Sequence, residues 1–149
     1  MTSRSQLRRE AIQKSQQAPV FAKVYVTASC HQGGEERRTR AVQALEAFSD
    51  GRVHFEVLTF SPYDKQGRLD AIRDAGALLL VYTDDVGQDS ALVEAGIAAG
   101  IDKTVICWLD ESCRTKRPVM LTPPVMWGSC DLDNCIIMLA RYVLYGPER

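Results

Sequence analysis

The sequence predicts an α/β fold with a parallel sheet of about five strands, and three observations lead to this prediction. Segments rich in β-branched and aromatic residues alternate along the chain with segments of helical periodicity. The segment Leu78–Tyr82 (LLLVY) is apolar throughout, as expected for a parallel strand that is covered on both faces. Turns rich in glycine or aspartate separate these segments. This alternation implies right-handed crossovers and three layers, with helices on both faces of the sheet.

Length and composition indicate one globular domain. The chain has 149 residues, of which 46% are hydrophobic and 25% charged, and its formal net charge is −1. This charge gives no signal for binding a nucleic-acid polymer. No apolar run approaches the roughly 18 residues of a membrane span, and the start lacks the apolar core of a secretion signal, so we expect a cytoplasmic protein with no membrane partner.

The expected elements begin after a basic, polar tail at residues 1–19, which is either a solvated tail or an arm that reaches a partner subunit. The domain at 20–149 then alternates strands and helices. Expected strands are Val20–Thr27, Val53–Phe60, Leu78–Tyr82, Thr104–Leu109 and a short Val125–Trp127. Expected helices are Glu35–Phe48, Leu69–Ala75, one that follows Ser90 as its N-cap, and Cys135–Tyr145, with Ser61–Arg68 as a loop.

The cysteines indicate neither a metal centre nor a disulfide framework. The five are Cys30, Cys107, Cys113, Cys130 and Cys135, an odd set that contains no CxxC pair. Reduced thiols in a cytosolic protein are the favoured interpretation, with zinc or disulfides as the alternative. We therefore expect no metal and no cofactor.

Three predicted loops follow the carboxyl ends of strands, where parallel sheets bind ligands. They are residues 28–34, 83–90 and 128–134. The first passes from a strand through Ser29, Gly33 and Gly34 into a helix, an arrangement that is either a phosphate cradle or a plain strand–helix corner. In the last, Asn134 suits a helix N-cap and a ligand contact alike.

Glu94 is the most informative single residue, because its neighbours from Ala91 to Ala98 are otherwise small or apolar. Such a carboxylate is either an exposed point on an amphipathic helix or a placed functional group. Paired with an acid, a carboxylate can attack the anomeric carbon of a glycoside and form a covalent intermediate. Asp85 or Asp89 could supply the acid. Tyr25 is either an orienting hydroxyl or an ordinary strand aromatic.

Four segments together resemble the nucleoside 2-deoxyribosyltransferase superfamily, which includes the 2′-deoxynucleoside 5′-phosphate N-hydrolases. They are KVYVTAS from Lys23, ASCHQGGEERRTRAVQALEAF from Ala28, LLLVYTDDVGQDSALVEAGIAAGIDKTVI from Leu78, and VMWGSCDLDNCIIM from Val125. The resemblance implies a flavodoxin-like, Rossmann-like three-layer sandwich. It also implies cleavage or transfer at the N-glycosidic bond of a nucleoside or nucleoside 5′-monophosphate, by a homo-oligomer with shared active sites.

The resemblance also assigns roles to residues. It implies that Glu94 is the nucleophile and Tyr25 its contact, with the aspartate at 85 or 89 as the proton donor. It further implies that Ser29, Gly33 and Gly34 bind a 5′-phosphate. Asp70 and Ser90 are further candidate substrate contacts, and the resemblance places Asn134 at a neighbouring subunit's site.

Two other hypotheses remain open. The segment Ser90–Val93 (SALV) stands where the family usually carries glycines, so the chain could be a nucleotide-binding or interaction module that has lost catalysis. A thioredoxin-like redox role for Cys30 is a third hypothesis, against which the lack of a CxxC pair argues.

Overall fold

Five parallel strands form the centre of the structure, a computed structural model. It describes residues 3–7, 18–29, 32–48, 53–58, 64–83, 89–109, 125–126 and 131–145. The strands are β1 (Val20–Ala28), β2 (Val53–Val57), β3 (Ala77–Tyr82), β4 (Thr104–Leu109) and the two-residue β5 (Val125–Met126). Their order is β2-β1-β3-β4-β5 and every pairing is parallel. This is the flavodoxin-like order, so the predicted fold class is confirmed.

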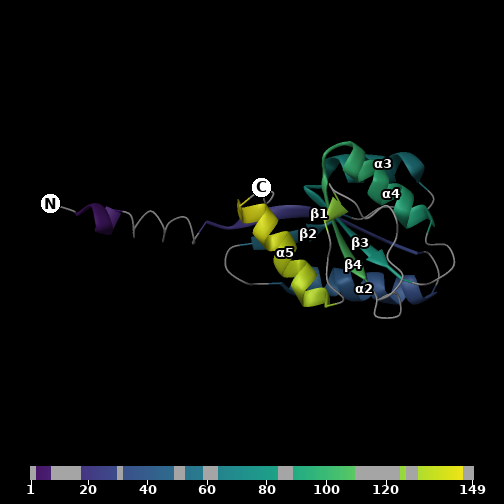
Figure 1. The fold of residues 1–149 in the computed structure, drawn as a ribbon, viewed down its shortest axis with the longest axis horizontal. Coiled ribbons are helices and arrows are strands. Elements are labelled where there is room, and N and C mark those ends of the chain that lie inside the picture. The colour runs from purple at the N-terminus through teal and green to yellow at the C-terminus, as the bar shows by residue number, and fades with distance from the viewer. Residues whose placement is uncertain are drawn as a thin grey trace.

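Two pairs of helices cover the sheet, one pair on each face (Figure 1). The helices are α2 (Gln32–Ala47), α3 (Lys65–Asp74), α4 (Asp89–Gly100) and α5 (Leu132–Tyr145). Helices α2 and α5 pack on one face, and α3 and α4 pack on the other. The three-layer arrangement follows from a sheet that buries apolar side chains in both directions.

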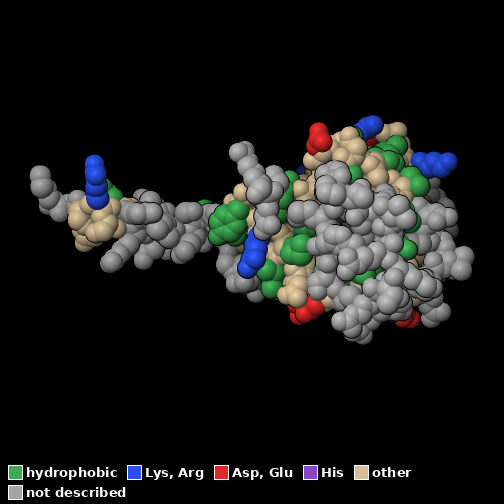
Figure 2. All heavy atoms as spheres, in the orientation of Figure 1, with side chains coloured by type: hydrophobic (Ala, Val, Ile, Leu, Met, Phe, Trp, Pro, Cys, Tyr) green, Lys and Arg blue, Asp and Glu red, His purple; other side chains and the backbone are tan. Residues whose placement is uncertain are grey.

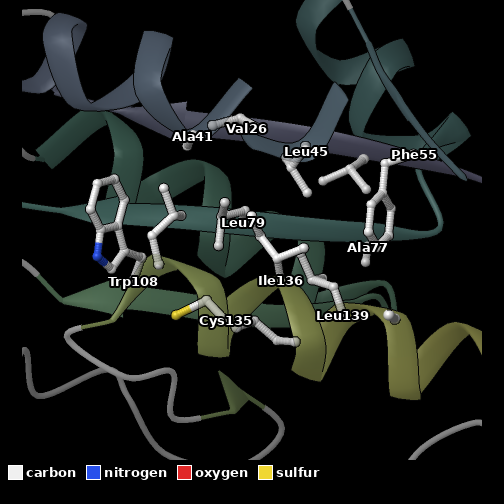
Figure 3. Packing of buried hydrophobic residues seen from close by; sticks show 14 of the residues in the cluster. Val26, Ala41, Leu45, Phe55, Ala77, Leu79, Trp108, Cys135, Ile136 and Leu139 are labelled. Carbon is white, nitrogen blue, oxygen red and sulfur yellow. The ribbon is translucent and has the colours of Figure 1, made fainter. Parts of the chain in front are cut away.

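Alternating side chains divide the core into two clusters. Val24 and Val26 of β1 and Leu79 of β3 face α2 and α5, where Trp108 and Leu139 join them (Figure 3). The intervening residues of the same strands, among them Tyr25, Leu78 and Leu80, face α3 and α4. Because successive side chains of a strand point to opposite faces, Tyr25 and Thr27 lie on the same side as α4.

Helix α3 begins four residues before the predicted helix at Leu69, so the prediction of a loop through Arg68 is wrong. The cause is an N-cap. The side chain of Asp64 accepts a hydrogen bond from the Gly67 amide at 2.9 Å. A Cβ at Gly67 would lie 2.4 Å from the Asp64 carboxylate, so this glycine fits the cap and does not break the helix.

Helix α5 begins three residues before the predicted Cys135. Asp131 precedes it and accepts a hydrogen bond from the Asp133 amide at 3.0 Å. Asp131 therefore caps this helix, and the prediction of an N-cap at Asn134 is wrong. Ser90 is likewise the second residue of α4, which begins at Asp89, and so it is not the N-cap.

Helix α2 begins at Gln32, so Gly33 and Gly34 lie in its first turn and not in a loop. A Cβ at Gly34 would lie only 2.2 Å from the carbonyl oxygen of Ser29. The absent side chain lets the helix start directly against the end of β1. Strand β2 ends at Val57, and the last two residues of the predicted strand, 59 and 60, lie outside the described residues.

Near the amino terminus, residues 4–7 form a single helical turn, in which the Leu7 amide donates to the Ser3 carbonyl at 3.1 Å. In the space-filling view, the acidic and basic side chains that can be seen lie apart from one another, mostly around the outline of the molecule (Figure 2). Among the described residues, no helix is both long and apolar enough to span a membrane.

Candidate functional site

The buried polar residues of the described chain gather at one edge of the sheet. They are Thr27, Ser29, Thr83 and Glu94. Thr27 and Ser29 lie at the end of β1, Thr83 directly follows β3, and Glu94 lies in the first half of α4. This edge holds the carboxyl ends of the parallel strands, where α/β sheets bind ligands. The described core is otherwise built from hydrophobic residues, so this polar cluster is the candidate site.

Glu94 faces the sheet, because it shares a side of α4 with the fully buried Ala91, Ala95 and Ala98. These positions are three and four residues apart, which places them on one face of a helix. The alanines let α4 lie close to the strands, so the longer glutamate reaches β1. Glu94 is only 7% exposed, which excludes the interpretation of an exposed helix residue.

Two hydroxyls of β1 meet the Glu94 carboxylate. The Tyr25 hydroxyl donates to Oε2, and the Thr27 hydroxyl donates to Oε1 at 2.8 Å. The two residues are two positions apart on a strand, so their side chains share a face. The structure therefore brings together Glu94 and Tyr25, which the sequence put forward, and adds Thr27.

Arg68 of α3 completes the contacts of Glu94, and it was missed in the sequence. Its Nη2 donates to Oε1, and its Nε donates to Oε2 at 3.3 Å. Because α3 begins at Lys65, Arg68 is held on a helix that packs on the same face of the sheet as α4. Asp64, a cap residue followed three positions later by glycine, was the signal that could have placed it on a helix.

The four donors occupy all the acceptor positions of the carboxylate. An ionised carboxylate offers about four lone-pair positions, two on each oxygen. Each Glu94 oxygen accepts one bond from the Arg68 guanidinium and one from a β1 hydroxyl. In this arrangement the Glu94 carboxylate is held in one orientation, and all of its lone-pair positions accept hydrogen bonds.

The surroundings fix the protonation of the two partners. Burial raises the pKa of Tyr25 above its ordinary 10.0, and its hydrogen bond to Glu94 raises this pKa further, so the phenol remains a donor at neutral pH. The hydrogen bond to Glu94 also raises the pKa of Arg68, so the guanidinium stays charged. Tyr25 and Arg68 therefore both act as hydrogen-bond donors toward the carboxylate.

Of the phosphate-cradle candidates, Ser29 belongs to the polar cluster and Gly34 packs against it. Ser29 is buried directly after β1, beneath Gly34. Gly33 lies one residue earlier in the first turn of α2, and its carbonyl accepts a hydrogen bond from Arg37 at 3.2 Å. The close approach of Gly34 to Ser29 thus explains why this position is a glycine, and no ligand is needed for that explanation. The amide groups of a first helical turn are also a common place for an anion to bind.

Other candidates lie away from Glu94. Asp70 is an exposed residue of α3, where it accepts from Gln66 at 2.9 Å and lies 3.8 Å from Arg73. It is two residues from Arg68 on the same helix, a spacing at which side chains do not share a face. Asn134 is exposed in the first turn of α5, which covers the opposite face of the sheet. Within one chain the structure does not bring Asn134 to Glu94.

The proton-donor candidates fall largely outside the described residues. Asp85 lies in the undescribed segment 84–88, and Asp89 begins α4 with a side chain that is not described. Ser90 follows it as an exposed residue of the first turn. The redox candidate Cys30 also lies outside the described part.

Two of the five cysteines belong to the described core. Cys107 and Cys135 are free thiols that are both buried. The Cys135 thiol donates to the Cys107 carbonyl, with 3.7 Å between sulfur and oxygen. Among the described residues, no group of three or more His, Cys, Asp or Glu side chains is placed to hold a metal ion.

No protein-family model matches the chain, and no curated protein matches it with significant similarity. These comparisons therefore assign no family. A functional proposal therefore depends on the geometry of Glu94 and its partners Tyr25, Thr27 and Arg68.

Proposed function

We propose that the chain cleaves or transfers at the N-glycosidic bond of a nucleoside or nucleoside 5′-monophosphate, with Glu94 as nucleophile. The observation that carries this proposal is a buried carboxylate at the carboxyl edge of a parallel sheet, oriented by two hydroxyls of β1. An aligned carboxylate of this kind suits attack on a sugar carbon, because its position relative to the substrate is fixed before reaction.

The proposed reaction has two steps. A Glu94 oxygen forms a bond to the anomeric carbon while the bond from that carbon to the base nitrogen breaks, and the base leaves with the electron pair and takes up a proton. Asp85 or Asp89, close before Glu94 in the chain, is the proposed donor of that proton. Water or the nitrogen of a second base then attacks the same carbon and releases Glu94. Water makes the protein a hydrolase, and a second base makes it a transferase.

The resemblance to the nucleoside 2-deoxyribosyltransferase superfamily supports the same proposal through the segments at Lys23, Ala28, Leu78 and Val125. In this proposal, the first turn of α2 with Ser29, Gly33 and Gly34 receives a 5′-phosphate. The amide groups at the start of α2 and its helix dipole favour a negative charge there.

Incubation with a panel of nucleosides and nucleoside monophosphates, with and without a second free base, tests the proposal. Chromatography is expected to show free base from at least one substrate, and loss of that release in Glu94→Gln. Glu46→Gln is the matched control, because Glu46 is an exposed glutamate of α2. Equal rates of base release in wild type and Glu94→Gln would remove Glu94 as nucleophile.

A second candidate function is a nucleotide-binding module without catalysis, and Arg68 is the observation that favours it. Its guanidinium engages both oxygens that a nucleophile would use. Residues 90–93 also continue α4 without a glycine beside Glu94. Binding of a nucleotide in calorimetry, with no product from any member of the panel, is the outcome expected for this module.

We also propose that the protein forms a homo-oligomer, and the outer side of α4 supports this. Val93, Ile97 and Ile101 are 61%, 37% and 43% exposed and lie four residues apart, which places them in one stripe. Ile97→Glu is expected to shift sedimentation toward the monomer, whereas an unchanged oligomer would exclude this stripe as the interface.

A further inference from the structure

We propose that Arg68 is a specificity-determining residue, which a phosphate group of the substrate draws away from Glu94. This inference rests on the proposed function, since it concerns how the same carboxylate becomes available. Its consequence is that a nucleoside monophosphate exposes the nucleophile, whereas an uncharged nucleoside leaves the ion pair closed.

Glu94 cannot attack a sugar carbon while all four hydrogen-bond donors are in place. Each oxygen accepts two hydrogen bonds, one from Arg68 and one from Tyr25 or Thr27. A bond to carbon needs a lone pair directed at that carbon, and a carboxylate has about four such positions. At least one donor must therefore leave before the chemical step.

Arg68 is the donor that can leave the carboxylate. Tyr25 and Thr27 are 0% and 2% exposed, on a strand that pairs with β2 on one side and β3 on the other. Moving either residue would disturb the centre of the sheet. The side chain of Arg68 is 27% exposed, and it extends from α3, which covers the sheet from outside. A long arginine side chain changes rotamer at far lower cost than a paired strand moves.

A phosphate group is the ligand that can replace Glu94 as the partner of Arg68. A guanidinium that leaves a carboxylate needs another oxyanion, because its charge and its two parallel donors would otherwise lose their partner. Phosphate matches the same planar pair of N–H groups and carries more charge than a carboxylate. An uncharged nucleoside offers no group that could replace Glu94. The geometry therefore favours a phosphate-bearing substrate.

Calorimetric titration with inorganic phosphate tests the exchange without any turnover. If Glu94 and phosphate compete for Arg68, then Glu94→Gln binds phosphate about tenfold more tightly than wild type, because a larger fraction of Arg68 is available. Arg68→Gln is expected to weaken this binding without abolishing it, because the phosphate site proposed at the first turn of α2 remains. Arg73→Gln is the matched control, because Arg73 is an exposed arginine of α3 whose ion pair is with Asp70.

The double variant Glu94→Gln with Arg68→Gln separates competition from a general effect of removing one negative charge. Competition predicts that the tenfold gain vanishes in the Arg68→Gln background. A gain that persists there, or Glu94→Gln binding phosphate no more tightly than wild type, would overturn the proposal. Thermal unfolding of each variant verifies that it is folded, and the wild type and Glu94→Gln comparison stands even if Arg68→Gln unfolds.

The activity arm measures the ratio of kcat/KM for a nucleoside monophosphate to that for its nucleoside. Arg68→Gln is expected to lower this ratio at least about tenfold, mainly by raising turnover of the nucleoside. An unchanged ratio in an active, folded variant would also overturn the proposal. If no variant releases base, the proposed function fails, and the phosphate titrations alone decide whether Arg68 exchanges partners.

Discussion

The guanidinium of Arg68 and the carboxylate of Glu94 form a two-point ion pair that joins α3 to α4 on one face of the sheet. The pair is unequal in burial, since the Glu94 side chain is 9% exposed and that of Arg68 is 27% exposed. The buried partner cannot reach water if its counter-ion is removed, whereas the arginine can. This inequality has consequences for both stability and activity.

Arg68→Gln is expected to destabilise the fold more than Glu94→Gln, because it leaves a buried carboxylate without a cation. Removal of one partner from a fully buried pair costs about 3–5 kcal/mol, and the partial exposure of Arg68 reduces this to about 1–3 kcal/mol. Urea unfolding of both single variants and the double variant measures the difference. The double variant should be more stable than the sum of the two losses predicts, and strict additivity would show that the pair is not coupled.

Tyr25→Phe is expected to change the response of the fold to alkaline pH. The pKa of Tyr25 is raised in the folded protein, so the unfolded chain loses this proton first as the pH rises through 10.0. The stability that Tyr25 contributes is therefore fully present below that pH and declines above it. Tyr25→Phe should lose less stability between pH 8 and pH 11 than wild type does, as measured by urea unfolding at each pH.

The control for this measurement is Tyr145→Phe, which replaces a side chain that is 81% exposed. It should lose as much stability over the same pH interval as wild type. Identical pH profiles for Tyr25→Phe and wild type would contradict the burial of a protonated Tyr25 beside Glu94.

Gly34→Ala and Gly100→Ala are expected to change stability in opposite directions. A Cβ at Gly34 would lie 2.2 Å from the Ser29 carbonyl oxygen, so the start of α2 must move, at a cost of about 1–3 kcal/mol. A Cβ at Gly100 meets nothing within 4 Å, and alanine reduces the freedom of the unfolded chain by about 0.4–1 kcal/mol. Thermal unfolding should give a lower Tm for the first variant and an equal or higher Tm for the second.

Asp64→Ala is expected to destabilise the first turn of α3 by about 1 kcal/mol, because the Gly67 amide loses its acceptor. Arg68 lies in the turn that this cap fixes, so its hydrogen bonds to Glu94 should weaken as well. Asp70→Ala is the control on the exposed side of the same helix. Equal stabilities for the two variants in urea unfolding would show that Asp64 does not cap α3.

The sequence predicts the alternating fold because parallel strands and their helices carry distinct local periodicities. The apolar run at Leu78–Tyr82 and the strand at Thr104–Leu109 appear in the structure within one residue of their predicted bounds. The helix starts were predicted less well. A glycine at 67 looks like a loop residue in the sequence, and only the cap geometry at Asp64 shows that it belongs to α3.

Some residues of the candidate site could likewise be predicted from the sequence, and others could not. Glu94 is conspicuous because a charged residue interrupts an apolar helix, and Tyr25 is a candidate because a strand tyrosine can orient a carboxylate, a role that the family resemblance also implies. Arg68 is 26 residues from Glu94, and no local pattern links the two, so their contact emerges only when α3 and α4 share a face of the sheet. Thr27 was passed over because a threonine near the end of a strand is ordinary there.

The central claim is that Glu94 forms a covalent bond to the sugar, and mass spectrometry of the quenched reaction tests it most directly. The wild-type protein is mixed with the deoxynucleoside monophosphate from which the substrate panel shows the most base release, quenched with acid within the first turnover, and digested. We predict a deoxyribosyl phosphate adduct on the peptide that contains Glu94, and neither adduct nor base release in Glu94→Gln. Base release by Glu94→Gln at the wild-type rate would contradict the account.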